Sequence, residues 1–120
     1  MINVWKTLKD RIQGKAEKGQ RRSSQWKKVR AAHLEEHPEC ECCGRKTELE
    51  VHHVIPFSIA PDKELDPENL ITLCESKKNG INCHLLLGHL GDYKRFNQNV
   101  KSDVLEWRAK LGRLNINNDL

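Results

Sequence analysis

The sequence has no apolar run long enough to cross a membrane, since the longest uninterrupted one is the three residues Leu85–Leu87. It also has no apolar leader of the secretory kind, because Lys6, Lys9 and Arg11 interrupt the N-terminal segment. Internal repeats and long low-complexity tracts are missing as well, which argues against a repeat array. These absences favour a cytoplasmic protein with no membrane segment.

The chain is also short and poor in apolar residues. Its 120 residues are 37% hydrophobic and 32% charged, and the mean hydropathy is −0.76. This length suits a single domain, and a domain so small and polar buries only a thin core. A metal site that cross-links the chain would therefore help to stabilise the fold.

Positive charge is concentrated near the N-terminus. Residues 1–30 contain ten Lys or Arg and two acidic residues, whereas residues 31–120 contain eleven Lys or Arg and fifteen Asp or Glu. A basic arm on a mildly acidic body is suited to binding a phosphate backbone, although a basic tail can also serve solubility alone. The candidate DNA-backbone contacts, which would position DNA without reading its sequence, are Arg21, Arg22, Lys27, Lys28 and Arg30.

Hydrophobic spacing and turn residues predict an α+β fold. The predicted helices cover residues 4–12, 24–37, 83–90 and 102–112, and the predicted strands cover residues 49–55 and 70–73, with a loop between the strands. Ser24 and Ser102 are the expected N-caps of two of these helices, and Gly112 is expected to end the last one. The side chains placed on or near the apolar face of that last helix are Val104, Leu105, Trp107 and Leu111. Two short strands are too little sheet to stand without support.

The five cysteines are better candidates for metal binding than for disulfides in a reducing compartment. Cys40 and Cys43 form a C-x-x-C-G knuckle, in which the glycine lets the backbone turn tightly over a metal. Cys74 and Cys83 form a second, wider pair, and Cys42 is left over. Four thiolates at about 2.3 Å would make a closed structural zinc site, whereas the alternative is a set of reduced, buried cysteines.

Further motifs follow the knuckle in a fixed order. They are Glu50-Val51-His52-His53-Val54-Ile55-Pro56, Glu68-Asn69-Leu70-Ile71-Thr72-Leu73-Cys74 and Cys83-His84. With the knuckle they resemble the HNH endonuclease family in its four-cysteine branch, over residues 38–90, and residues 85–93 look like phage-associated members. The resemblance implies a small ββα-metal domain, in which a β-hairpin and a helix hold a divalent ion, with a four-cysteine zinc site and flanking helices.

The resemblance also implies a role for each polar residue of these motifs. His53 matches the general base, and Asn69 matches the asparagine that orders the loop and holds this base. His52 and His84 match the ligands of the catalytic ion. Chemistry agrees with this division, because adjacent strand residues point to opposite faces and imidazole titrates near neutral pH.

His89 has two interpretations, because it follows His84 by five residues. On an ideal α-helix this spacing places the two side chains about 140° apart. His89 is then either a third metal ligand or phosphate contact, or an ordinary residue at the helix end. A site built on imidazoles accepts Zn²⁺, Ni²⁺, Co²⁺ or Mn²⁺ as well as Mg²⁺, so the sequence leaves the catalytic ion open.

The sequence thus predicts an endonuclease that hydrolyses DNA phosphodiester bonds with one catalytic divalent ion and a structural Zn²⁺. Residues 1–22 would form a basic arm, residues 23–114 the nuclease domain and residues 115–120 a tail. We expect a monomer or weak dimer, since a double-strand cut needs a dimer or two successive nicks. The resemblance adds phage terminase subunits as partners, in a bacterial host cell. The alternatives are a non-catalytic zinc module that binds nucleic acid, and a restriction or homing endonuclease.

Overall fold

The computed structural model describes residues 21–76 and 81–113. The predicted helix over residues 4–12 and the predicted tail over residues 115–120 lie outside these residues. The elements run in the order α2 (Trp26–Glu36), β1 (Leu49–His53), η1 (Pro61–Lys63), η2 (Pro67–Asn69), β2 (Leu70–Cys74), η3 (His84–Gly88) and α3 (Val100–Arg113). A β-hairpin followed by a helix makes this a small α+β domain, as the sequence predicts.

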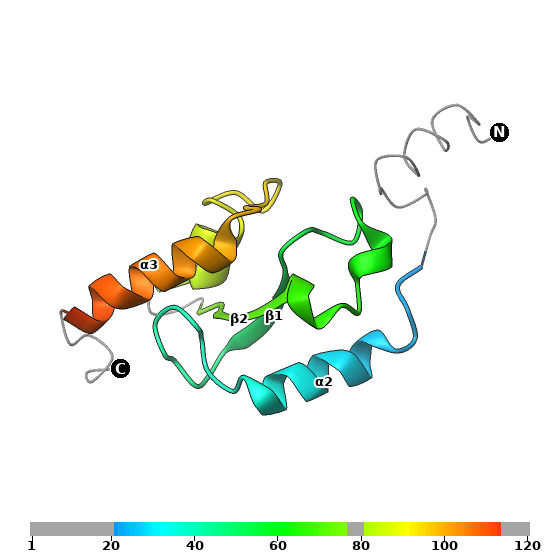
Figure 1. Ribbon diagram of the computed structural model, residues 1–120, viewed down its shortest axis with the longest axis horizontal. Coiled ribbons are helices and arrows are strands. Elements are labelled where there is room, and N and C mark those ends of the chain that lie inside the picture. Colours follow the sequence, from blue (N-terminus) through cyan, green and yellow to red (C-terminus); the bar gives the residue numbers. More distant parts are fainter. Residues whose placement is uncertain (1–20, 77–80, 114–120) are drawn as a thin grey trace.

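The two strands form one antiparallel pair, with Val51 opposite Thr72 and His53 opposite Leu70. Figure 1 shows the strands in the middle of the domain, with α2 along one side and α3 on the other. α2 contacts both strands, and α3 contacts η3. Every residue of β2 is buried. The elements packed around the sheet therefore provide the burial that two strands alone cannot.

The core is built from cysteines and aliphatic side chains. Ile71 and Leu73 of β2 pack with Val100 and Val104 of α3 around the buried cysteines. The two valines lie four residues apart and so share one face of the helix. None of the helices in residues 21–76 and 81–113 has the length and apolar character that a membrane crossing needs.

The predicted ends of two helices are wrong. The N-cap position of α2 is Gln25, and its N–H donates to the Ser23 hydroxyl at 3.0 Å, so Ser24 is not the cap. α3 begins at Val100, before Ser102, and it continues through Gly112 to Arg113.

The apolar face predicted for the last helix is also wrong in part. Leu105 is 70% exposed and Trp107 is 46% exposed. Val104, which the same prediction placed on this face, is buried, Leu111 packs against the core, and the earlier start of the helix adds the buried Val100.

The helix predicted over residues 83–90 is present, but it is shorter than predicted and is not an α-helix. The segment forms a single π-helical turn, His84–Gly88. It ends there because Leu90 and Gly91 have φ values of 54° and 85°, which are incompatible with a continuing right-handed helix. This turn carries part of the site described below.

The Asn69 side chain orders the long connection between the strands. Its Oδ1 accepts a hydrogen bond from the Ile55 N–H at 2.8 Å, and its Nδ2 donates to the carbonyls of Ile55 at 3.0 Å and Lys63 at 3.2 Å. The Val54 N–H donates to the Asn69 carbonyl at 2.8 Å. One buried side chain therefore links the end of β1, the middle of the connection and the start of β2.

The substitution Asn69→Ala should lower the free energy of unfolding by about 2–4 kcal/mol, because it leaves buried backbone groups without partners. Urea unfolding of the zinc-loaded protein, followed by tryptophan fluorescence, measures this change. Gln98→Ala, at an exposed position before α3, is the control and should change stability little. A loss below about 0.5 kcal/mol for Asn69→Ala would show that the connection does not depend on this side chain.

Candidate metal centres

Four of the five cysteines come together from three segments. Cys40 and Cys43 precede β1, Cys74 ends β2, and Cys83 directly precedes η3. Their sulfur atoms all lie within 4.8 Å of one another, and the Sγ atoms of Cys43 and Cys74 are 3.7 Å apart. A tetrahedral zinc ion with Zn–S bonds of about 2.3 Å separates its sulfur ligands by about 3.8 Å. The cluster therefore has the size of a four-thiolate zinc site.

Backbone hydrogen bonds preform the knuckle. The Gly44 N–H donates to the Cys40 carbonyl at 2.9 Å, and the Cys40 N–H donates to the Arg45 carbonyl at 2.7 Å. Gly44 has a φ of 81°, a conformation that favours glycine. Cys42 is buried but lies outside the group of four, as the sequence predicts.

The protonation of the cluster also fits a cation. Hydrogen bonding from the Cys43 thiol holds the pKa of Cys40 far below its usual value. Hydrogen bonds with Cys40 raise the pKa values of Cys43, Cys74 and Cys83. The four sulfurs thus compete for the same protons, because hydrogen bonds from neighbouring thiols stabilise a thiolate. A divalent ion removes this competition by binding the thiolate forms, which is why such sites couple metal binding to folding.

Three histidines form a second cluster between β1 and η3. The candidate ligand atoms of His52, His84 and His89 lie within 4.8 Å of one another, and the Nε2 atoms of His84 and His89 are 3.1 Å apart. Two nitrogens bound to one ion at about 2.1 Å are separated by about 3.0–3.4 Å. The spacing of these imidazoles therefore fits a shared ion.

Hydrogen bonds at Nδ1 fix the tautomers of the His84 and His89 rings. His84 Nδ1 lies 3.3 Å from Glu75 Oε1, and His89 Nδ1 lies 2.7 Å from the Arg95 carbonyl oxygen. Both oxygens can only accept, so each Nδ1 carries the proton and each Nε2 presents a lone pair. His52 Nε2 is buried without a hydrogen-bond partner. Lone pairs that face one another repel, and a cation among them would relieve this repulsion.

The π-helical turn explains how His89 joins the cluster. A π-helix closes hydrogen bonds between residues i and i+5, so residues five apart lie on one face. His84 and His89 have this spacing, and their ring centroids are 4.7 Å apart. The sequence prediction assumed an α-helix, which would turn His89 away from His84. The structure brings the two together.

Gly88 makes room for His52. A Cβ atom at position 88 would lie 3.1–3.3 Å from three atoms of the His52 ring, closer than side chains usually pack. The buried glycine therefore lets β1 and the π-helical turn approach closely enough for their imidazoles to meet.

His53 takes a different position from its neighbour. Its Nε2 donates to the Glu64 carbonyl at 2.9 Å, which leaves Nδ1 as the basic nitrogen. The Trp26 ring of α2 packs against it, with ring centroids 4.4 Å apart. Asn69 bonds the Lys63 carbonyl next to Glu64, so it holds the segment that anchors His53.

Burial favours the neutral form of the imidazoles of His52, His53 and His84. Desolvation, reinforced by the charges of His84 and His89, lowers the pKa of His52 to about 3. Desolvation also lowers the pKa of His53 and the pKa of His84 below the usual value. Neutral imidazole is the form that binds a metal or accepts a proton.

A pocket of about 220 Å³ is lined both by the three clustered histidines and by His53. Its lining includes His52, His53, His84 and His89 together with Arg22. The Arg22 guanidinium stacks 4.6 Å from the centre of the Phe57 ring and lies 3.6 Å from Glu64 Oε2. A cationic group thus stands beside the histidines, where an anionic substrate could reach it.

The other predicted DNA contacts lie outside this pocket. Arg21, Lys27 and Lys28 are exposed. Arg30 forms an ion pair with Glu50, with its Nη2 atom 3.6 Å from Glu50 Oε2. Sequence reasoning missed Trp26, because no local pattern links that residue to His53.

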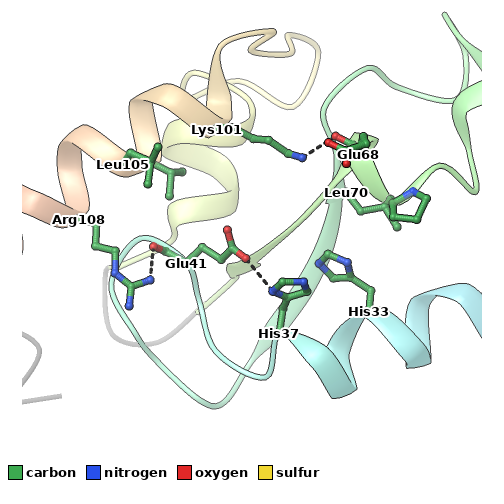
Figure 2. A pocket seen from close by; sticks show the side chains of 10 residues that line it. His33, His37, Glu41, Glu68, Leu70, Lys101, Leu105 and Arg108 are labelled. Carbon is green, nitrogen blue, oxygen red and sulfur yellow. Dashed lines mark hydrogen bonds and ion pairs between the residues drawn. The ribbon is translucent and has the colours of Figure 1, made fainter.

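A larger groove of about 400 Å³ lies between the end of α2 and α3. Figure 2 shows that its labelled polar side chains mostly interact with neighbouring groups. His37 Nδ1 lies 3.2 Å from Glu41 Oε1, Lys101 Nζ donates to the Glu68 carbonyl, and Arg108 donates to the Glu41 carbonyl. Among the described residues, no three metal-ligating groups converge there. The smaller histidine pocket is the better candidate site.

The model of one protein family, described as HNH endonuclease, matches residues 40–86. This segment contains the four clustered cysteines, His52, His53, Asn69 and His84, but not His89. No curated protein and no solved structure matches the chain significantly.

The substitution Cys40→Ser should remove the structural ion, because a hydroxyl is a much poorer zinc ligand than a thiolate. We expect the purified variant to lose zinc and to unfold at lower urea concentration than the parent. Cys42→Ala removes a buried thiol outside the cluster and should keep its zinc. Metal analysis and urea unfolding of both variants check this, and equal zinc loss in the two would contradict the assignment.

The substitution Gly88→Ala should weaken binding of the second ion, because the new methyl group displaces the His52 ring. Calorimetric titration of zinc-loaded protein with Ni²⁺ measures the affinity, and the zinc content should not change. Gly112→Ala is the matched control, since its Cβ would meet nothing within 4 Å. It should leave Ni²⁺ binding intact and add about 0.5–1 kcal/mol of stability to α3. Unchanged Ni²⁺ affinity in Gly88→Ala would refute the role of this close contact.

Proposed function

We propose that this protein is a metal-dependent endonuclease that hydrolyses phosphodiester bonds in DNA. One observation carries the proposal: candidate ligand nitrogens of three histidines lie within 4.8 Å of one another, in a pocket that is also lined by the separately anchored His53 and by Arg22. The family match over residues 40–86 supports the same reaction class.

The ligand sets divide between two ions. Cys40, Cys43, Cys74 and Cys83 would hold a structural Zn²⁺, and His52, His84 and His89 would hold a catalytic ion. Imidazole donors favour Zn²⁺, Ni²⁺, Co²⁺ or Mn²⁺ more than they favour Mg²⁺. When bound at the histidines, such an ion supplies Lewis-acid stabilisation of the charge that develops on the phosphate and the leaving oxygen.

His53 would act as the general base. Its Nε2–H is committed to the Glu64 carbonyl, so Nδ1 accepts the proton of an attacking water. The Glu64 carbonyl then stabilises the imidazolium form, because a hydrogen bond to it raises the pKa of His53 against the effect of burial. Asn69 acts indirectly, by keeping this part of the connection in place.

Arg22 would contact the phosphate from the opposite side of the pocket. Its guanidinium is half exposed, which leaves donors available to a ligand. Arg21, Lys27 and Lys28 would extend the contact along the DNA backbone. Binding of this kind depends strongly on salt and carries little sequence information.

A second candidate function, a zinc module that binds nucleic acid without cutting it, accounts for the four cysteines. It gives no reason for the imidazole nitrogens of His52, His84 and His89 to gather within 4.8 Å of one another. The resemblance of residues 85–93 to phage-associated proteins supports a role with terminase subunits in genome packaging.

The substitution His53→Ala should lower the rate of plasmid nicking by about 10²–10⁴-fold, because it removes the general base. Supercoiled plasmid is incubated with zinc-loaded protein in Mg²⁺, Mn²⁺, Ni²⁺, Co²⁺ or EDTA. His37→Ala, which removes a histidine from the α2–α3 groove, should nick like the parent. Unaltered zinc content in both variants shows that they fold.

Two results would contradict the proposal. Absence of metal-dependent nicking by the parent protein would favour the binding module. Equal nicking by parent and His53→Ala would show that His53 is not the base.

A further inference from the structure

Glu75 connects the zinc site to the histidine cluster. It directly follows the zinc-site residue Cys74, and its N–H donates to the Glu48 carbonyl at 2.7 Å, which fixes its backbone at the end of β2. Its carboxylate oxygen Oε1 lies 3.3 Å from His84 Nδ1. The same oxygen accepts a hydrogen bond from the Tyr93 hydroxyl at 2.6 Å.

This carboxylate determines what His84 can do. An ionised carboxylate only accepts, so it holds the proton of His84 on Nδ1 and leaves the Nε2 lone pair toward the cluster. The Arg95 backbone carbonyl, a neutral acceptor 2.7 Å from His89 Nδ1, holds the proton of His89 on Nδ1 in the same way. A charged acceptor makes the opposite nitrogen a stronger donor than a neutral one does. His84 is therefore the ligand whose affinity for a cation depends on a replaceable side chain.

Tyr93 holds the carboxylate in place. Besides its hydrogen bond to Glu75, the Tyr93 hydroxyl lies 3.5 Å from Asn82 Nδ2. The ring lies against both imidazoles, with centroids 5.9 Å from His84 and 5.1 Å from His89. Tyr93 thereby restricts the Glu75 side chain to the orientation that reaches His84.

We propose that Glu75, held by Tyr93, is a positioning residue that orients His84 and strengthens it as a ligand of the catalytic ion. The proposal rests on the proposed assignment of His52, His84 and His89 to that ion. Neither Glu75 nor Tyr93 belongs to the ligand set itself. The carboxylate acts through the imidazole, from the segment that also supplies a zinc ligand.

Calorimetric titration of zinc-loaded protein with Ni²⁺, in the absence of DNA, tests the proposal. Glu75→Ala should weaken Ni²⁺ binding by about 10–100-fold. Glu75→Gln, which keeps an acceptor without the charge, should give a smaller loss, and Tyr93→Phe should give a loss of a few fold. Glu36→Ala removes an exposed carboxylate from α2 and should bind Ni²⁺ like the parent.

A double-mutant comparison separates positioning from other roles. In a His84→Ala background, Glu75→Ala should have no further effect on Ni²⁺ affinity, because the carboxylate acts only through His84. A full additional loss in that background would show that Glu75 binds the ion directly or supports the fold, and would overturn the proposal. Unchanged affinity in the single variant Glu75→Ala would overturn it as well. Retained zinc in every variant excludes loss of the neighbouring thiolate site.

The experiments test the nuclease proposal and the positioning role of Glu75 separately. Parent protein that binds Ni²⁺ but never nicks plasmid would refute the nuclease, while the effect of Glu75 on Ni²⁺ affinity would still be measurable. Parent protein that nicks plasmid, with Glu75→Ala unchanged in Ni²⁺ affinity, would refute only the positioning role.

Discussion

The meeting of four cysteine sulfurs is the constraint on which the rest of the structure depends. Cys40 and Cys43 come from the knuckle, Cys74 from the end of β2 and Cys83 from the residue before η3. Two short strands and a few aliphatic residues bury little surface, so an ion bound by these sulfurs would supply the stability that the core lacks. Such an ion would also fix the position of Cys83, and His84 is the residue that follows it. The thiolate site thus sets the position of the histidine site.

Within that frame, close approach of backbone segments builds the histidine cluster. Gly88 lets the π-helical turn pack against His52, and the five-residue spacing of this turn aligns His84 with His89. Burial lowers the pKa values of His52 and His84, and the Glu75 carboxylate lies 3.3 Å from His84 Nδ1. His53 remains outside the cluster, because its Nε2 is bonded to the Glu64 carbonyl in the connection between the strands. In the proposed function, two adjacent residues of β1 therefore supply a metal ligand, His52, and the general base, His53.

Much of this arrangement could be predicted from the sequence where the signal is local. The C-x-x-C-G knuckle and the positions of Cys74 and Cys83 predicted a cluster that the structure brings together. The His52-His53 pair on a strand predicted that the two rings would face different surroundings. Helical periodicity did not predict that His89 lies beside His84, because it assumes 3.6 residues per turn and this segment is π-helical. Glu75, Tyr93 and Trp26 could not be predicted, since their partners come from other parts of the chain.

X-ray absorption at two metal edges, on protein loaded with zinc and then with Ni²⁺, tests most directly whether the chain holds two ions on separate ligand sets. The zinc edge should show four sulfur ligands at about 2.3 Å. The nickel edge should show nitrogen or oxygen ligands with the outer-shell scattering of imidazole and without sulfur. Sulfur at the nickel edge, or imidazole at the zinc edge, would contradict the division of thiolates and histidines between two ions.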